Sequence, residues 1–340
     1  MRRRGGCSGG GRSSRLRQGE QSAGRFDLVY AYPVHATHRR PPAGLEPRHR
    51  GTGPVQRTNP GGRFDYTTVG HVTVDVMDDG TRRPGGSAFY SALQASRLGL
   101  RALILTRGRR DEIEALLEPY RDELEVEIEP AERTTTLHTS GSGPARSQRV
   151  LAWAGPIESE PVLDTGILHL APVARESPRR WRGDVGFVGL TPQGLARRWS
   201  AHRGEISLTT VEPGALPARC QAVVISEVER ESCAELLSRA SEAGAIVAVT
   251  AGHRPTTILL PGGETLHAPH TPVEERGEDL GAGDVFAAAF FVALREGQAP
   301  KSAAAFAGAA AALRIGSRGT SGIAGRSTIE SRVRPRRGGG

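Results

Sequence analysis

The chain has 340 residues, enough for one large hydrophobic core or two modest ones, with 45 basic residues against 37 acidic ones. The positive charge is concentrated at the ends: residues 1–63 carry thirteen arginines against three acids, and residues 326–340 five against one. Residues 64–325 are therefore mildly acidic. No apolar run approaches the roughly 18 residues of a membrane span, so we expect neither a transmembrane helix nor a secretory leader.

Both ends are expected to be disordered tails, at residues 1–63 and 326–340. The first of them is rich in Gly, Pro, Ser and Arg and has no helical or strand periodicity, so it has too little apolar surface to order itself. Nucleic-acid binding through these arginines is the weaker alternative, because aromatic residues for base stacking are few. The three cysteines form no CxxC pair, which fits a reducing, cytoplasmic compartment.

The folded part is predicted to begin with a parallel βαβ unit. Tyr66–Met77 is rich in β-branched residues and predicts a strand with Asp75 near its end, and residues 87–98 predict a helix that stops at Gly99. A second short strand follows. Gly85 and Gly86, just before the helix, are either an ordinary turn or a place where the backbone approaches a ligand closely.

Residues 108–150 give weaker signals than the segments on either side. A helix is expected over residues 111–120, then strands around a Gly-rich turn, and two buried strands over residues 166–172 and 184–190. Gln193 and Arg197 are spaced so that they would share one face of a helix, which we expect to be solvated. From Ala222 a strand, a helix over residues 228–244 and a second strand continue the α/β alternation.

The most informative stretch is residues 278–294, EDLGAGDVFAAAFFVAL. Glycines followed by an apolar run predict a loop entering a buried helix, where free N–H groups and the helix dipole favour an anion such as phosphate. Asp284 then has two interpretations. It caps the helix, or it takes a proton from a substrate hydroxyl while the N–H groups of Gly281, Ala282 and Gly283 stabilise a transferring phosphoryl group.

GAGDVF resembles the C-terminal signature of the ribokinase-like (PfkB) carbohydrate kinases, usually DTxGAGDxF, with Glu278 and Asp279 in place of the Asp and Thr. VGHVTVD followed by PGGSAFYSALQASRLG is similar to the N-terminal part of the same kinases, with Tyr90 where the family usually has Asn. The resemblance covers roughly residues 64–325. It implies one three-layer α/β/α domain with a mostly parallel central sheet. Only nine residues separate Asp75 from Gly85, so we expect the lid over the sugar site to be reduced or absent.

The resemblance also implies a set of site residues. Asp284 would be the catalytic base, beside the N–H groups of the loop at Gly281–Gly283. Asp75, Gly85 and Gly86 would line the substrate site, Ser226, Thr250 and Gly252 would contact the nucleotide phosphates, and Glu229 would hold magnesium through water. The implied cofactors are ATP and Mg²⁺, with a monovalent cation such as K⁺ as a further candidate.

The function implied is an ATP-dependent kinase that phosphorylates a hydroxyl of a small polyol, such as a sugar, a cyclitol or a nucleoside. There is a faint likeness to the inositol kinase branch. Without a full lid, a monomer or a weak homodimer is expected. The alternative from another class is a non-catalytic ribokinase-like module that binds a nucleotide or a partner, because Glu278, Asp279, Ser226 and Pro255 depart from the family pattern.

Overall fold

The computed structural model describes residues 63–333, apart from residues 142, 179 and 274–276. What the sequence predicts for residues 1–62 and 334–340 lies outside the described residues. Across the part that is described, no helix combines the length and the apolar character that a membrane crossing requires.

The described chain contains both strands and α-helices, with a long run of strands in its middle and three consecutive helices at its end. The strands are β1 (Phe64–Val69), β2 (Thr73–Met77), β3 (Arg82–Gly85), β4 (Ala102–Gly108), β5 (Glu125–Pro130), β6 (Thr136–Ser140), β7 (Ser147–Ala152), β8 (Val162–Leu170), β9 (Arg182–Leu190), β10 (Arg197–Trp199), β11 (Ile206–Leu208), β12 (Ala222–Ser226), β13 (Ile246–Ala251), β14 (Arg254–Leu259) and β15 (Thr265–Ala268). The α-helices are α1 (Ser87–Arg97), α2 (Arg110–Leu117), α3 (Ala234–Glu242), α4 (Ala282–Arg295), α5 (Pro300–Ile315) and α6 (Arg326–Val333).

A nine-stranded sheet forms the centre of the fold, in the order β15-β14-β13-β12-β9-β8-β1-β4-β5. Every neighbouring pair from β13 to β5 is parallel, and only β14 and β15 at one edge run antiparallel to their neighbours. Parallel strands place their carboxyl ends at one edge of the sheet, where ligands of open α/β sheets bind. The expected α/β class with a mostly parallel central sheet is confirmed.

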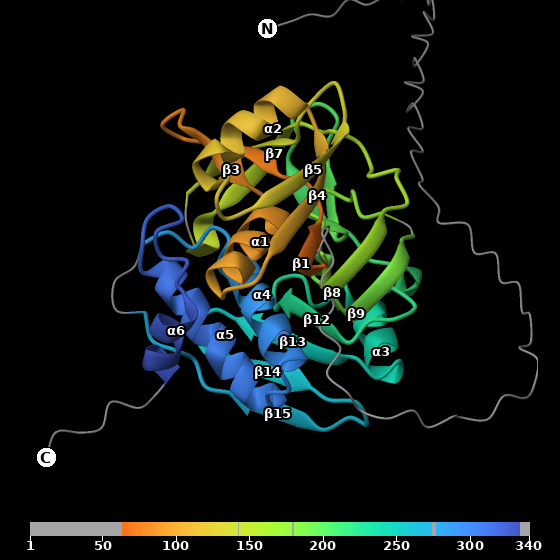
Figure 1. Ribbon diagram of the computed structural model, residues 1–340, viewed down its shortest axis with the longest axis vertical. Coiled ribbons are helices and arrows are strands. Elements are labelled where there is room, and N and C mark those ends of the chain that lie inside the picture. Colours follow the sequence, from red (N-terminus) through yellow and green to blue (C-terminus); the bar gives the residue numbers. More distant parts are fainter. Residues whose placement is uncertain (1–62, 142, 179, 274–276, 334–340) are drawn as a thin grey trace, which may run out of the picture. The chain divides into compact units, whose positions relative to one another are not determined.

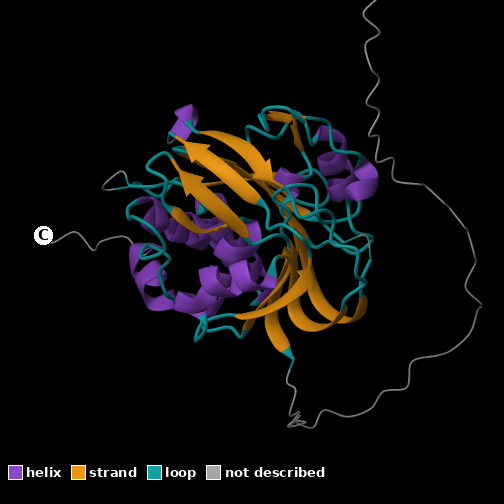
Figure 2. Ribbon diagram, turned by 90° about the horizontal axis from the view of Figure 1, so that it is seen from above, coloured by secondary structure: helices purple, strands orange, loops and turns teal. Residues whose placement is uncertain are grey.

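Helices cover both faces of this sheet (Figures 1 and 2). On β12, Ala222 and Val224 belong to the core shared with α1, α4 and α5, whereas Val223 and Ile225 belong to the core shared with α3. Strands buried on both faces need apolar residues at every position, which explains the continuous run AVVI. The three layers of the expected fold are therefore present.

A second sheet of four strands, in the order β3-β2-β6-β7, corrects two expectations. The strand predicted over Tyr66–Met77 is two strands in different sheets, because the chain turns away from the large sheet at Gly70, where a Cβ atom would lie 2.2 Å from the carbonyl oxygen of Ala171. The short β2–β3 hairpin, from which a reduced lid was expected, is also only half of this sheet. Strand β6 pairs in parallel with β2, and β7 pairs with β6, so a distant hairpin completes the sheet.

The C-terminal helices differ from expectation at one end. Helix α4 lies where the sequence predicts it. Residues 326–333, expected to be a disordered tail, form helix α6, and Ile329 on it is fully buried. Ile329 packs in the core shared with α5, and an ion pair from Arg326 to Glu296 also holds this short segment.

Candidate active site

The first turn of α4 begins at Gly281, which has a left-handed backbone with φ of +79°. A side chain here would be strained, and a Cβ atom would also lie 2.4 Å from the ring of Tyr90. The Ala282 N–H donates to the carbonyl of Asp279, at 3.1 Å. Among the described residues no hydrogen bond engages the N–H groups of Gly283 and Asp284. Two free donors at the positive end of a helix form a suitable site for a phosphoryl group.

Asp284 lies in this first turn and is partly buried. Desolvation raises the pKa of its carboxyl group to about 6, although a hydrogen bond from Ser87 and the positive charges of Arg197 and Arg146 act in the opposite direction. The helix cap Gly281 has no side-chain hydrogen bond, so Asp284 is not acting as the N-cap. A carboxyl group whose pKa is close to neutrality can accept a proton and later release it.

Asp75 projects from β2 in the second sheet and is almost fully buried. The Thr73 hydroxyl donates to its Oδ1 atom at 2.7 Å, and Gly85 lies so close that a Cβ atom there would be 2.1 Å from Oδ2. Burial raises the pKa of Asp75 to about 6, and the charge of Asp284 contributes in the same direction. The two carboxylates, far apart in sequence, therefore interact across the same site.

The carboxyl ends of β12 and β13 bring a further group of predicted residues together. Ser226 and Thr250 are register partners, and Gly252 follows in a turn with φ of +60°. Glu229 lies in the turns after β12, not on the helix predicted there, and it is buried with its carboxylate bonded to the Ser226 hydroxyl. Desolvation raises the pKa of Glu229, whereas Arg197 and Arg146 lower it.

Two arginines at the site were not singled out as site residues from the sequence. Arg197 was expected on a solvated helix face. It lies on β10 instead, where its guanidinium donates to the carbonyl of Val173 at 3.1 Å and to the side chain of Gln148 at 3.1 Å. Its charge acts on Asp284, Asp75 and Glu229 alike, and the charge of Arg146 acts on Asp284 and Glu229. No sequence signal identifies either, because neither belongs to a local motif.

An ion pair joins the second sheet to the loop before α4. Arg83 on β3, the register partner of Asp75, donates through both terminal nitrogens to the carboxylate of Glu278. Both side chains are mostly buried. A second pair, between Arg146 and Asp279 at 3.2 Å, links the β6–β7 loop to the same segment. Glu278 and Asp279, the two departures from the family signature, thus hold the second sheet against the loop.

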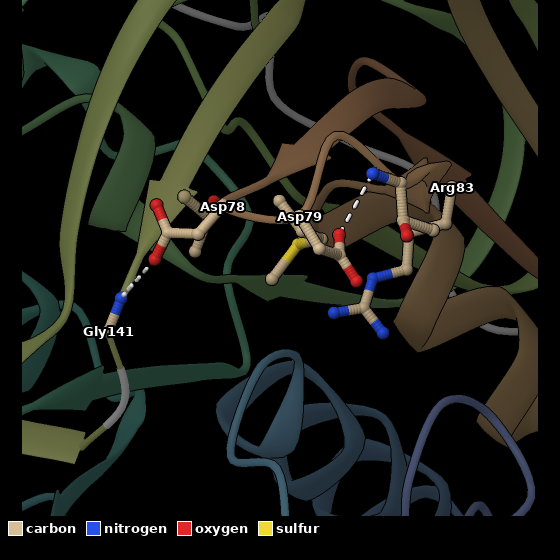
Figure 3. A pocket seen from close by; sticks show the side chains of 7 residues that line it. Asp78, Asp79, Arg83 and Gly141 are labelled. Atoms are coloured by element: carbon tan, nitrogen blue, oxygen red, sulfur yellow. Dashed lines mark hydrogen bonds between the residues drawn. The ribbon is translucent and has the colours of Figure 1, made fainter.

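A cavity of about 320 Å³ lies beside Arg83 (Figure 3). Its walls come from the β2–β3 hairpin and the end of β6, namely Met77, Asp78, Asp79, Thr81, Arg83, Thr139 and Gly141. In Figure 3 the carboxylates of Asp78 and Asp79 are engaged by their own hairpin and by Gly141. Neither Asp75 nor Asp284 lines this cavity, whereas Arg83, the register partner of Asp75, does.

The implied Mg²⁺ and monovalent cation need different ligands, the first a carboxylate and the second a set of carbonyl oxygens. Within the described ranges no group of three or more His, Cys, Asp or Glu residues could hold a metal by itself. Mg²⁺ commonly uses one carboxylate together with water and phosphate oxygens. Glu229, at the carboxyl end of β12, is the carboxylate that the resemblance implies, and its side chain is bonded to the Ser226 hydroxyl. K⁺ needs a set of free carbonyl oxygens. Beside the loop at Gly281, the carbonyls of Glu278 and Ser317 are already engaged by the guanidinium of Arg314, at 2.9 and 3.5 Å.

Comparison with known proteins agrees with the fold and the motif. Residues 216–324 match the family model described as pfkB family carbohydrate kinase. A search of curated proteins finds no match.

Solved structures of the ribokinase family share the fold at low sequence identity. Ribokinase from Arabidopsis thaliana, solved with ribose and ATP, is 17% identical, with 80% of this chain and 99% of that chain covered and a TM-score of 0.61. A pyrophosphate-dependent kinase in the ribokinase family, solved with a pyrophosphate analog and myo-inositol, is 21% identical, with coverage of 78% and 99% and a TM-score of 0.60. The Methanocaldococcus jannaschii nucleoside kinase is 16% identical, with coverage of 80% and 99% and a TM-score of 0.58. The resemblance to the ribokinase-like (PfkB) carbohydrate kinases that the sequence motifs indicate is therefore confirmed.

Proposed function

We propose that this protein is a kinase that transfers the terminal phosphoryl group of ATP to a hydroxyl of a small polyol. The observation that carries the proposal is the pair of carboxylates, the partly buried Asp284 and the buried Asp75, that interact beside two free N–H groups at the start of α4. A base, a hydroxyl-binding acid and an anion-binding loop are the three parts that phosphoryl transfer to an alcohol requires.

In this mechanism Asp284 accepts the proton of the attacking hydroxyl as the new O–P bond forms and the bond to the leaving phosphate breaks. The N–H groups of Gly283 and Asp284 stabilise the charge on the moving phosphoryl group. Bound Mg²⁺ supplies neutralisation of the donor phosphates, and Glu229 would hold it through water. Ser226, Thr250 and Gly252, at the ends of β12 and β13, would border the donor phosphates.

Asp75 would fix the acceptor. A carboxylate accepts hydrogen bonds from two adjacent hydroxyl groups, and its near-complete burial strengthens these bonds. The positive charge of Arg197 acts on all three acids. It therefore reduces the repulsion that Asp75, Asp284 and Glu229 would exert on a phosphate donor. We infer that this arginine is what makes three acids compatible with an anionic substrate.

Among acceptors we favour a cyclitol such as myo-inositol. The support is the sequence likeness to the inositol kinase branch and the shared fold with a kinase solved with myo-inositol. That kinase uses pyrophosphate, so pyrophosphate is the alternative donor. A donor without a nucleoside would need only the phosphate contacts at Gly281–Asp284, Ser226 and Thr250.

The test is an assay of phosphorylated product with ATP or pyrophosphate against pentoses, hexoses, nucleosides and inositols. We expect turnover on one polyol class, dependent on Mg²⁺. ATP binding by calorimetry without turnover on any acceptor would favour the non-catalytic module instead. Inorganic phosphate released from pyrophosphate is measured separately, because ADP-coupled assays do not detect it.

A further inference from the structure

The largest fully buried side chain of the described residues is a cation, Arg314, in the last turn of α5. Burying a charge without a counter-charge is costly, so its surroundings should show why it is there. Arginine cannot release its proton at any ordinary pH. The positive charge is therefore a permanent part of this interior.

The partners of Arg314 are mainly backbone carbonyls. Its Nη1 donates to the carbonyl of Glu278 at 2.9 Å and to that of Ser317 at 3.5 Å, and its Nη2 is 3.8 Å from the carboxylate of Glu278. The Nε and Nη2 atoms make no hydrogen bond among the described residues. The C-terminal end of a helix adds partial negative charge at the same place. Carbonyl oxygens, one carboxylate and a helix C-terminus form the environment that a monovalent cation prefers.

The same guanidinium also contacts the Tyr90 ring, which packs against the loop at Gly281. Its central carbon lies 5.5 Å from the centroid of the Tyr90 ring, a cation–π distance, and the Tyr90 ring packs directly against Gly281. The residues before the loop also pair with the end of α5 and the segment that follows it: the N–H of Gly277 donates to the carbonyl of Ile315 at 2.9 Å, and the N–H of Glu278 to that of Ser317 at 3.3 Å. Arg314 therefore contacts both segments that determine where Gly281 lies.

We propose that Arg314 is a built-in cation that takes the place of a bound monovalent ion beside the loop. The proposal rests on the proposed kinase function for its activity readout only. It names Arg314 as a positioning residue, because it acts on the phosphoryl site through Glu278 and Tyr90. It follows that neither the rate nor the stability of the protein depends on K⁺.

The first experiment uses the unmodified protein. Product formation and the thermal midpoint are measured in potassium chloride and in choline chloride at equal ionic strength. We expect both to agree, the rates within about twofold. A stimulation by K⁺ of more than about twofold overturns the proposal, since the ion would then have a site that Arg314 does not fill.

The second experiment removes the cation. Arg314→Ala is expected to lower the thermal midpoint, and sub-denaturing guanidinium chloride is expected to restore part of it, whereas urea, which is planar and neutral, is not. Arg239→Ala on the exposed face of α3 is the control, and guanidinium should not raise its midpoint. If Arg314→Ala and the unmodified protein have the same thermal midpoint in choline chloride, the proposal is overturned.

A third comparison keeps the proposal testable if the alanine variant does not fold. Arg314→Lys retains the charge and Arg314→Met has a similar volume without it. We expect the Lys variant to be the more stable of the two, and equal midpoints overturn the proposal. Because these stability measurements need no turnover, they decide the role of Arg314 even if no acceptor is phosphorylated and the proposed function fails.

Discussion

The two halves of the candidate site are built in different ways. The loop at Gly281–Asp284 is one contiguous stretch, and its geometry follows from a glycine with positive φ and a helix that begins immediately afterwards. The opposite half is the second sheet, which is assembled from two distant hairpins and held to the loop by Arg83 and Glu278. The groups proposed to perform the chemistry are thus fixed locally, whereas the groups proposed to select the substrate depend on long-range packing. Each half can be disturbed separately.

The largest effect is expected from Asp284→Asn. Loss of the base should reduce turnover by a factor on the order of 10² or more, because proton transfer typically contributes 10² to 10⁴. Steady-state kinetics with saturating substrates measure it. Glu231→Gln, an exposed acid in the turn before α3, is the control and should retain full turnover. An Asn variant with undiminished turnover would refute the assignment of the base.

Gly281→Ala should disturb the loop half structurally. The added methyl group faces both a positive φ and the Tyr90 ring, so we expect a loss of about 2–4 kcal/mol in the free energy of unfolding. Chemical denaturation measures it. Gly283→Ala is the matched control, since a Cβ atom at Gly283 meets nothing within 4 Å. Equal stability of the two variants would contradict the packing described for Tyr90.

Arg83→Met should disturb only the second-sheet half. Without its ion pair to Glu278 the sheet loses one attachment to the loop, so KM for the polyol should rise by about tenfold with a smaller change in kcat. Arg82→Met, the next residue on the strand, removes a more exposed ion pair to Glu112 and should leave KM unchanged. A larger fall in kcat than rise in KM for Arg83→Met would place Arg83 in the chemistry itself.

The smallest effects are expected in how activity and stability change with pH. The pKa of Asp284 is about 6 in the folded protein against 3.8 for an ordinary Asp, so activity should fall as the pH drops through about 6. The folded state also binds this proton more tightly than the unfolded chain. The associated stability is complete below about pH 3.8 and is lost as the pH rises through about 6.

Asp284→Asn should therefore be more stable than the unmodified protein at pH 8, by about 1 kcal/mol after allowance for partial exposure, with little difference near pH 4. Thermal midpoints at the two pH values measure it. An Asn variant that is less stable at pH 8 would show that the charged carboxylate is favoured in the folded protein.

Features that depend on residues close together in the chain could be predicted from the sequence. The parallel strands, α1, α4 and the loop at Gly281 follow from apolar periodicity and from glycines before a helix. It failed where distant segments meet. The strand containing Asp75 leaves the large sheet because Gly70 lies against Ala171, and no local pattern carries that information. For the same reason Arg197 was expected on a solvated helix although its partners, Val173 and Gln148, come from other elements.

The buried carboxylate of Glu176 gives the second sheet a fixed point of attachment. It accepts hydrogen bonds from the N–H of His71, where the chain passes from β1 to β2, at 2.8 Å, and from the N–H groups of Val173 and Ala174, at 2.7 and 2.6 Å. One side chain thus ties together the crossing between the sheets and the segment that follows β8. The start of the second sheet is thereby fixed to the large sheet through three hydrogen bonds to one fully buried carboxylate.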